Sequence, residues 1–214
     1  MVVTSIVFSM IMRWPIKSFA VFLFSGLVPW ILFSNCLAQG TQALLNNEGL
    51  IKKVYVPKQI FVVSVTVGLL IDAFFSTIAL FIMVLAIGAP LTWSLVVLPI
   101  NFLLLFFFSL GLALALSVAT VYFRDLPNIV GVLLQAGYYL TPILYPLSMV
   151  PERFRWMFDL NPMTAFVEIF RSPIYEGVFP AMNTYLTVAA LALVSFLFGM
   201  FIFRRFDRHI VFRL

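Results

Sequence analysis

Residues 93–120 have the sequence WSLVVLPINFLLLFFFSLGLALALSVAT, without one charged side chain. A membrane-spanning helix needs about 20 consecutive apolar residues, and this stretch is long enough for one. A β-barrel strand would instead alternate apolar and polar residues over about ten positions. Because residues 103–116 offer almost no polar face, the stretch predicts a transmembrane α-helix.

The composition of the whole chain agrees with this prediction. Of the 214 residues, 64% are hydrophobic and only 10% are charged, with a mean hydropathy of +1.13. Soluble domains carry about 25% charged residues and about 45–50% apolar ones. No soluble core of this size buries 25 phenylalanines, so a soluble enzyme is excluded. A chain of this length also has no room for a separate catalytic domain.

The intervals without charge, or with Asp72 as their only charged residue, place the other spans near 19–37, 60–87, 127–147 and 183–203. Met1–Met12 is apolar but gives only about 18 Å of helix, against about 30 Å of hydrocarbon. We therefore expect it to be the outer half of a first span whose beginning is absent. The expected fold is an all-α polytopic membrane protein, a single domain over 1–214. It has five full transmembrane helices, a partial first one (1–12) and an outer re-entrant helical hairpin.

Basic residues predict the orientation, because Lys and Arg concentrate on the cytoplasmic side. One set of alternate connections, which includes the C-terminal tail, holds eight of the 13 Lys and Arg residues, and the other set holds five. The more basic set contains Lys52, Lys53, Lys58, Arg124, Arg204, Arg205, Arg208 and Arg213. We expect this set, and with it the C-terminus, to face the cytoplasm.

Residues 42–58 form the first connection on the expected inner side. A short helix here, ended by Pro57, would present Glu48, Lys52 and Tyr55 on one side, at spacings of four and three. A plain basic loop that sets topology and a docking element for a cytoplasmic subunit both fit this pattern. The candidate docking residues are Asn47, Glu48, Lys52, Lys53, Tyr55 and Lys58.

The second inner connection is the tight turn around Arg124 and Asp125. Asp125 followed by Pro127 suits a helix start, because an acid is stabilised at the positive end of the helix dipole. On local grounds this segment is a capping turn.

The outer segment 150–180 predicts two short helices. Asn161-Pro162 is a typical N-cap followed by proline at the first helical position. Met163, Phe166, Val167 and Phe170 then form an apolar stripe, with Glu168 and Arg171 expected opposite it and Ser172-Pro173 closing the helix. Pro151–Asp159 is a shorter amphipathic stretch. A re-entrant hairpin buried in protein and an interfacial cover both remain open.

Asp72 is the only acid inside a predicted span. A proton relay would need further ionisable groups at similar depth, so a structural or interhelical hydrogen-bonding role is favoured. Small residues recur every four positions in the 93–120 span, at Ser109, Ala113 and Ser117 and at Gly111, Ala115 and Ala119. This spacing favours close helix packing.

Several kinds of chemistry are excluded by single counts. Cys36 is the only cysteine and His209 the only histidine, so neither a disulfide nor a metal cluster is expected. No lysine follows a glycine, and a P-loop is therefore missing. The chain should hold no cofactor of its own, and ATP with Mg²⁺ would have to be used by a separate subunit. The basic residues fit membrane topology rather than nucleic-acid binding.

Five segments together resemble a known family. They are Leu27-Val28-Pro29-Trp30 with Phe33-Ser34-Asn35, the loop 47–58, Tyr122-Phe123-Arg124-Asp125-Leu126, Thr141-Pro142-Ile143-Leu144-Tyr145 and Leu160-Asn161-Pro162-Met163-Thr164. In this order they resemble the permease subunit of ABC exporters for O-antigen, capsular polysaccharide and teichoic acid. The resemblance covers essentially the whole chain, with the start of the first span missing.

The resemblance implies a homodimer in the bacterial inner membrane, bound to two nucleotide-binding ATPase subunits and moving a lipid-linked glycan. It implies that the loop 47–58, with Arg124 and Asp125, docks the ATPase. The hairpin would close the exit side of the channel. The residues implied at the channel or its exit are Tyr138, Tyr139, Tyr145, Trp156, Phe166 and Phe170; an interfacial aromatic belt also explains the tyrosines.

Three alternatives stay open from the sequence. An ABC permease for a drug or small lipid is the nearest. A secondary transporter would need inverted repeats or paired broken helices, which are not visible. A membrane-bound transferase would need clustered His, Asp or Glu residues, and the lone His209 argues against it.

Overall fold

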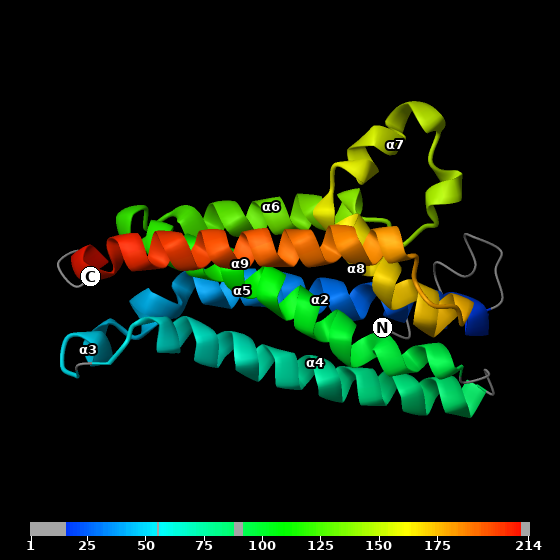
Figure 1. The fold of residues 1–214 in the computed structure, drawn as a ribbon, viewed down its shortest axis with the longest axis horizontal. Coiled ribbons are helices and arrows are strands. Elements are labelled where there is room, and N and C mark those ends of the chain that lie inside the picture. Colours follow the sequence, from blue (N-terminus) through cyan, green and yellow to red (C-terminus); the bar gives the residue numbers. More distant parts are fainter. Residues whose placement is uncertain (1–15, 55, 88–91, 211–214) are drawn as a thin grey trace.

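The computed structural model describes residues 16–54, 56–87 and 92–210, and the expected partial span 1–12 and Tyr55 lie outside these ranges. Within them the chain is built from helices and contains no strand. The long helices run side by side along the longest axis of the molecule (Figure 1). The prediction of an all-α polytopic membrane protein is confirmed.

Four helices are long and apolar enough to cross a membrane among the described residues. They are α2 (Ile16–Asn46), α4 (Gln59–Ile87), α5 (Leu98–Tyr122, preceded by the 3-10 turn η1, Trp93–Val97) and α9 (Met182–Ile210). The helix α2 continues past the expected boundary at 37, because no charged residue or proline occurs between Leu37 and Asn46.

The helix α6 (Leu126–Leu140) differs from its expected span, 127–147. It has 15 residues, which corresponds to a length of about 22 Å. It stops because Thr141 precedes Pro142, and the residue before a proline is pushed out of the helical region. Thr141 has the extended angles φ −99° and ψ 135°.

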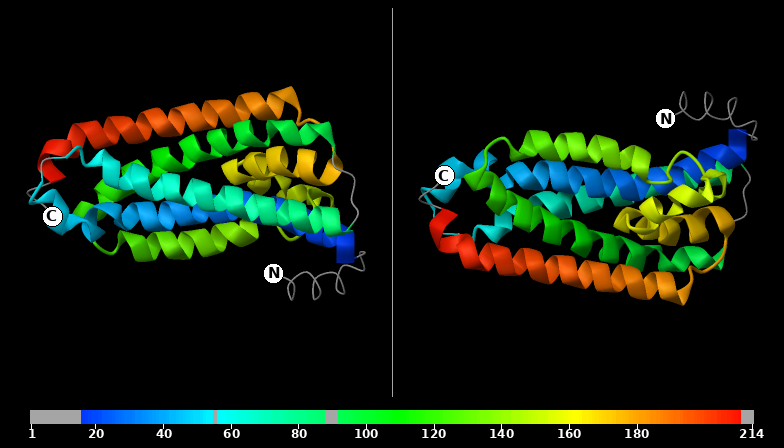
Figure 2. Two further views of the ribbon diagram at one scale, coloured as in Figure 1. Left: turned by 90° about the horizontal axis from the view of Figure 1, so that it is seen from below. Right: turned by 90° about the horizontal axis from the view of Figure 1, so that it is seen from above.

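The helix α2 is central and α4 and α9 are peripheral. Within the apolar window of α2, 78% of the residues are buried, against 28% in α4 and 28% in α9. Figure 2 shows α9 and α6 on opposite sides of the bundle, with α5 and α2 between them. Large apolar side chains are exposed on α4 (Phe75, Ile82) and on α9 (Leu193, Phe201), as expected for lipid-facing helices.

The core is held together by aromatic rings. The ring of Phe108 on α5 lies between Phe33 of α2 and Phe166, with centroid distances of 5.7 and 4.7 Å. Each such pair contributes about 0.5–1.5 kcal/mol beyond its buried area. A second cluster, which includes Leu44, Leu114 and Phe203, fills the other half of the bundle.

The helices α5 and α9 meet at two glycines. A Cβ added to Gly111 would lie 2.3 Å from the backbone of Ser195, and one added to Gly199 would lie 2.0 Å from the carbonyl oxygen of Gly111. Only glycine permits this approach, which agrees with the predicted small-residue packing.

The segment 150–180, called the hairpin below, contains α7 (Glu152–Asp159), α8 (Pro162–Arg171) and the π-helix η3 (Ser172–Glu176), after the 3-10 turn η2 (Leu147–Met149). The predicted cap is confirmed, because Oδ1 of Asn161 accepts a hydrogen bond from the backbone N–H of Met163 at 3.0 Å. The predicted stripe is also confirmed, because Met163, Phe166, Val167 and Phe170 are all buried. Ser172-Pro173 does not close the helix. The helical segment continues through η3 and ends at Gly177, whose φ is +72°.

The two ends of the bundle carry different elements. The four-residue helix α3 (Glu48–Ile51) and the C-terminal end of α9 lie at one end, here called the α3 end, and α7 projects from the other, the α7 end (Figure 1).

Candidate functional site

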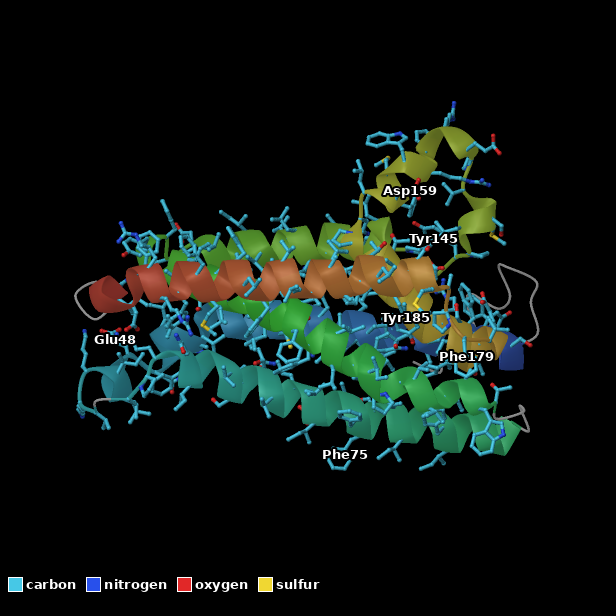
Figure 3. All side chains as sticks on the ribbon, viewed as in Figure 1. Glu48, Phe75, Tyr145, Asp159, Phe179 and Tyr185 are labelled. Atoms are coloured by element: carbon cyan, nitrogen blue, oxygen red, sulfur yellow. The ribbon has the colours of Figure 1, made fainter. Side chains whose placement is uncertain are left out.

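Two connections predicted to face the same side come together at the α3 end. The Nζ of Lys52 lies 2.5 Å from Oε1 of Glu48, at the i, i+4 spacing of a helix. Hydrogen bonding and charge from Lys52, with a weaker contribution from the charge of Arg124, lower the pKa of Glu48 below its ordinary value. The turn between α5 and α6 lies at the same end of the bundle as α3 (Figure 1). Figure 3 shows Glu48 at this end of the molecule.

Most of the candidate docking residues present charges to the surroundings. Lys53, Arg124 and Asp125 are exposed. Asp125 occupies the N-cap of α6 but makes no side-chain capping hydrogen bond. Asn47 has a local role, because its amide donates to the carbonyl of Ala43 at 2.8 Å and closes the end of α2.

Lys58 is placed differently from the other loop lysines. Its ammonium contacts Asp207 at the end of α9, at 3.0 Å from Oδ1 and 2.7 Å from the carbonyl oxygen, and its side chain is only 13% exposed. Its positive charge is therefore engaged within the chain rather than displayed for docking.

A stripe of amide side chains runs along the open face of α2. Gln39, Gln42 and Asn46 are exposed and Asn35 is half-buried. The spacings of four, three and four residues put these side chains, called the amide stripe below, on one helix face. The spacing of these amides is visible in the sequence. It was not predicted as a site because the predictions were based on charged residues and apolar periodicity, and amides are uncharged and polar.

An aromatic groove lies between α2 and α6. It is lined by Trp30, Ser34, Leu134, Gln135, Tyr138 and Tyr139. The rings of Trp30 and Tyr138 pack edge to face with centroids 5.9 Å apart, and Tyr139 is 69% exposed. The hydroxyl of Tyr145 donates to the carbonyl of Tyr139 at 2.8 Å, which ties the loop after α6 to the rim of this groove.

A second groove lies between α2 and α4, and Asn35 of the amide stripe is part of its lining. Asn35, Asp72 and Ser76 line it together with apolar side chains. Asp72 is exposed, and its carboxylate makes no hydrogen bond with the described part of the chain. The expected interhelical hydrogen bond is therefore not formed among these residues. Because an acid in hydrocarbon costs about 2.5–3.5 kcal/mol, this groove suits water or another protein surface better than lipid.

The other candidate exit residues have contrasting positions. Trp156 on α7 is exposed, and Tyr145 packs against Phe158 of the same helix. Phe166 and Phe170 are fully buried. They hold α8 in the core and present no surface to a substrate in this structure.

Arg171 requires a correction, because it does not lie opposite the apolar stripe of α8. Its guanidinium reaches α2, where it lies 3.8 Å from the ring centroid of Phe22, and it donates to the carbonyl of Ile143 at 3.3 Å. No local pattern in the sequence indicates this contact, because Phe22 lies far away along the chain.

These features define a multi-pass helical membrane protein with an amide-lined face, two grooves and a charged surface at one end, an arrangement that suits a transport subunit. The family model described as "ABC-2 type transporter" matches residues 1–175. The chain belongs to the ABC-2 type transporter family, and it is a transport component.

The chain is similar to several proteins that are named for polysaccharide export or transport. The chain is 34% identical over 196 residues to an O-antigen export system permease protein of Myxococcus xanthus, covering 91% of this chain and 75% of that protein. It is 29% identical over 174 residues to a protein of the same name from Klebsiella pneumoniae, covering 80% and 67%. It is 26% identical over 203 residues to the polysialic acid transport protein KpsM of Escherichia coli, covering 89% and 74%.

Proposed function

We propose that this chain is the channel-forming subunit of an ATP-driven exporter that moves a lipid-linked polysaccharide across the bacterial inner membrane. The relatives named above support the substrate class, because their names refer to O-antigen export and polysialic acid transport. The chain performs no bond chemistry.

The amide stripe is the observation that carries this proposal. Exposed amides on a membrane helix are unfavourable against lipid, but they offer donors and acceptors to a hydrated sugar chain. The aromatic groove between α2 and α6 adds the exposed ring of Tyr139. Exposed amides and an exposed aromatic ring suit a polar, flexible substrate that must slide without being held.

ATP is used by a partner subunit in this proposal. The sequence has no P-loop, so energy has to enter through a contact with a nucleotide-binding ATPase that binds ATP and Mg²⁺. The exposed charges around Glu48, Lys53 and Arg124 at the α3 end form the docking surface. This end, with the C-terminus, faces the cytoplasm.

Two copies of the chain enclose the path. The amide stripe and Asp72 lie on an open side of one protomer, and a polar face within a membrane requires water or protein opposite it. A second copy supplies the missing wall. ATP binding and hydrolysis push on the loop 47–58, the helices shift, and the glycan advances past the hairpin at the α7 end.

Export from cells tests the proposal directly. The gene, expressed with its ATPase subunit, should restore surface polysaccharide to a strain that lacks its own O-antigen or capsule permease, and a catalytically inactive ATPase should abolish the effect. Glycan that stays inside while a drug or a small lipid is exported would assign the chain to the alternative ABC permease class.

A further inference from the structure

The contact between Lys58 and Asp207 joins two distant parts of the chain at the α3 end. Lys58 lies in the turn just before α4, at the end of the loop 47–58, and Asp207 is in the last turn of α9. The ammonium is bound both by the carboxylate and by the carbonyl oxygen of Asp207, at 3.0 and 2.7 Å. Since this lysine is largely buried, a displacement of the loop pulls directly on α9.

The middle of α9 is fixed to α5 without side chains between the two backbones. Gly111 and Gly199 bring the backbones into contact, and any Cβ there would overlap the neighbouring chain. Near this crossing, the buried hydroxyl of Ser195 donates to the carbonyl of Phe108 at 2.7 Å. Helices packed this closely cannot slide past one another without clashes, so α5 and α9 move as one body.

The α7 end of this pair is bound to the hairpin through Asn101 of α5, which is completely buried. The hydroxyl of Tyr185 on α9 donates to Oδ1 of Asn101 at 2.8 Å, and Nδ2 of Asn101 donates to the carbonyl of Ile169 on α8 at 2.7 Å. Figure 3 labels Tyr185 at this end of α9.

Proline explains why Asn101 is needed at this position. The carbonyl of Ile169 would normally accept a hydrogen bond from the N–H of residue 173, but Pro173 has no N–H. A buried carbonyl without a donor is costly, and the amide of Asn101 satisfies it. The interruption of α8 by Pro173 therefore creates the acceptor to which the α5–α9 pair is attached.

We propose that the α5–α9 pair is a rigid lever that transmits displacement of the loop 47–58 to α8 and the hairpin, with Lys58–Asp207 at one end and the Tyr185–Asn101–Ile169 bridge at the other. This inference rests on the proposed function. The helix α9 has 29 residues, a length of about 43 Å, which reaches from one attachment to the other.

Single substitutions at the two ends test the lever in the complex with its ATPase, reconstituted into vesicles. Lys58→Met and Tyr185→Phe should each leave ATPase binding and ATP hydrolysis in place and lower the glycan exported per ATP at least about fivefold. A fluorophore at position 156, attached through Trp156→Cys with Cys36→Ser, should lose its nucleotide-dependent signal in both variants. Trp156 is exposed and Cys36 is the only native cysteine.

Matched controls separate the lever from general damage. Arg204→Gln removes an exposed cation from the end of α9 that carries Asp207. Tyr175→Phe removes a hydroxyl within the hairpin while keeping its ring contact with Phe22. Both should retain the export ratio and the signal. The exchange Lys58→Asp with Asp207→Lys should recover most of the ratio lost in Lys58→Met.

Two results overturn the inference in distinguishable ways. If the unmodified complex exports glycan and both Lys58→Met and Tyr185→Phe keep its ratio and its fluorescence response, the lever is wrong and the proposed function stands. If the unmodified complex shows no ATP-dependent glycan export, the proposed function fails and the lever fails with it.

Discussion

The guanidinium of Arg171 lies over the ring of Phe22, 3.8 Å from its centroid, and has no carboxylate in hydrogen-bonding contact among the described residues. Its Nε is buried without a partner. The contact joins α8 to α2, and the hydrogen bond to Ile143 adds the loop after α6. A single cation thus fastens the base of the hairpin to the central helix.

Replacing Arg171 with lysine should loosen the hairpin. Lysine keeps the charge but has no planar group to stack on Phe22, and a desolvated cation–π contact is worth about 2 kcal/mol. We expect a lower melting temperature in detergent and faster proteolysis between α7 and α8. Gly26→Ala should act in the same direction, because its Cβ would lie 3.0 Å from Nη2 of Arg171. Unchanged proteolysis in both variants would contradict this role.

Alanine at Gly111 or Gly199 should prevent correct packing of α5 on α9. The added Cβ would overlap backbone atoms at 2.3 or 2.0 Å, and overpacking typically costs about 1–3 kcal/mol or more. Fluorescence-detected size exclusion should show loss of monodisperse protein. Gly131→Ala on α6 is the matched control, because nothing lies within 4 Å of its Cβ position, and it should behave as the unmodified chain.

Removing charge from the docking surface should uncouple ATP hydrolysis from export. The variant replaces Lys52, Lys53 and Tyr55 together with alanine, and Lys52 and Lys53 are exposed. ATPase subunits should then hydrolyse ATP with little export, or fail to co-purify with the chain. Normal export by this variant would refute the assignment of the loop 47–58 to docking.

The Glu48–Lys52 pair should make α3 sensitive to acid. The pKa of Glu48 is lowered in the folded chain, first by Lys52 and then by Arg124. A carboxyl whose pKa is lower in the folded chain than in the unfolded chain stabilises the fold at pH values above its unfolded-state pKa. This contribution is lost as the pH falls through the folded-state pKa. Hydrogen exchange at residues 48–54, corrected for the pH dependence of the intrinsic exchange rate, should therefore become faster only below the ordinary pKa range of glutamate. Glu48→Gln should abolish this pH dependence.

Apolar substitutions on the amide stripe should block transport without unfolding the chain. Gln39→Leu with Gln42→Leu changes two exposed positions and removes donors and acceptors from the proposed path. Surface glycan should fall strongly while the melting temperature is maintained. Leu193→Ala, on the exposed face of α9, is the control and should export normally. Full export by the double variant would exclude the stripe from the path.

Local patterns in the sequence predicted the local structure well. The Asn161-Pro162 cap and the stripe from Met163 to Phe170 depend only on neighbouring residues, and both are confirmed. Pro142 indicates the early end of α6. The predicted span nevertheless extended to 147, because no charged residue occurs up to Pro151.

Long-range partners could not be predicted in the same way. Lys58 and Asp207 are 149 residues apart, and Asn101 and Ile169 are 68 apart. Hydrophobic periodicity assigns a residue to a face of its own helix but does not identify the helix that packs there. Asn101 is the only amide side chain in residues 93–120, and a polar side chain within a membrane span is energetically unfavourable unless it has a partner. The sequence does not indicate which residue that partner is.

The short length of α6 has a consequence for the membrane itself. A helix of 15 residues spans about 22 Å, against about 30 Å of hydrocarbon in an ordinary bilayer. Lipids beside a short helix thin to match it, and water and headgroups move inward. For the proposed glycan path along α2 and α6, the apolar layer would be about a quarter thinner than in the surrounding bilayer.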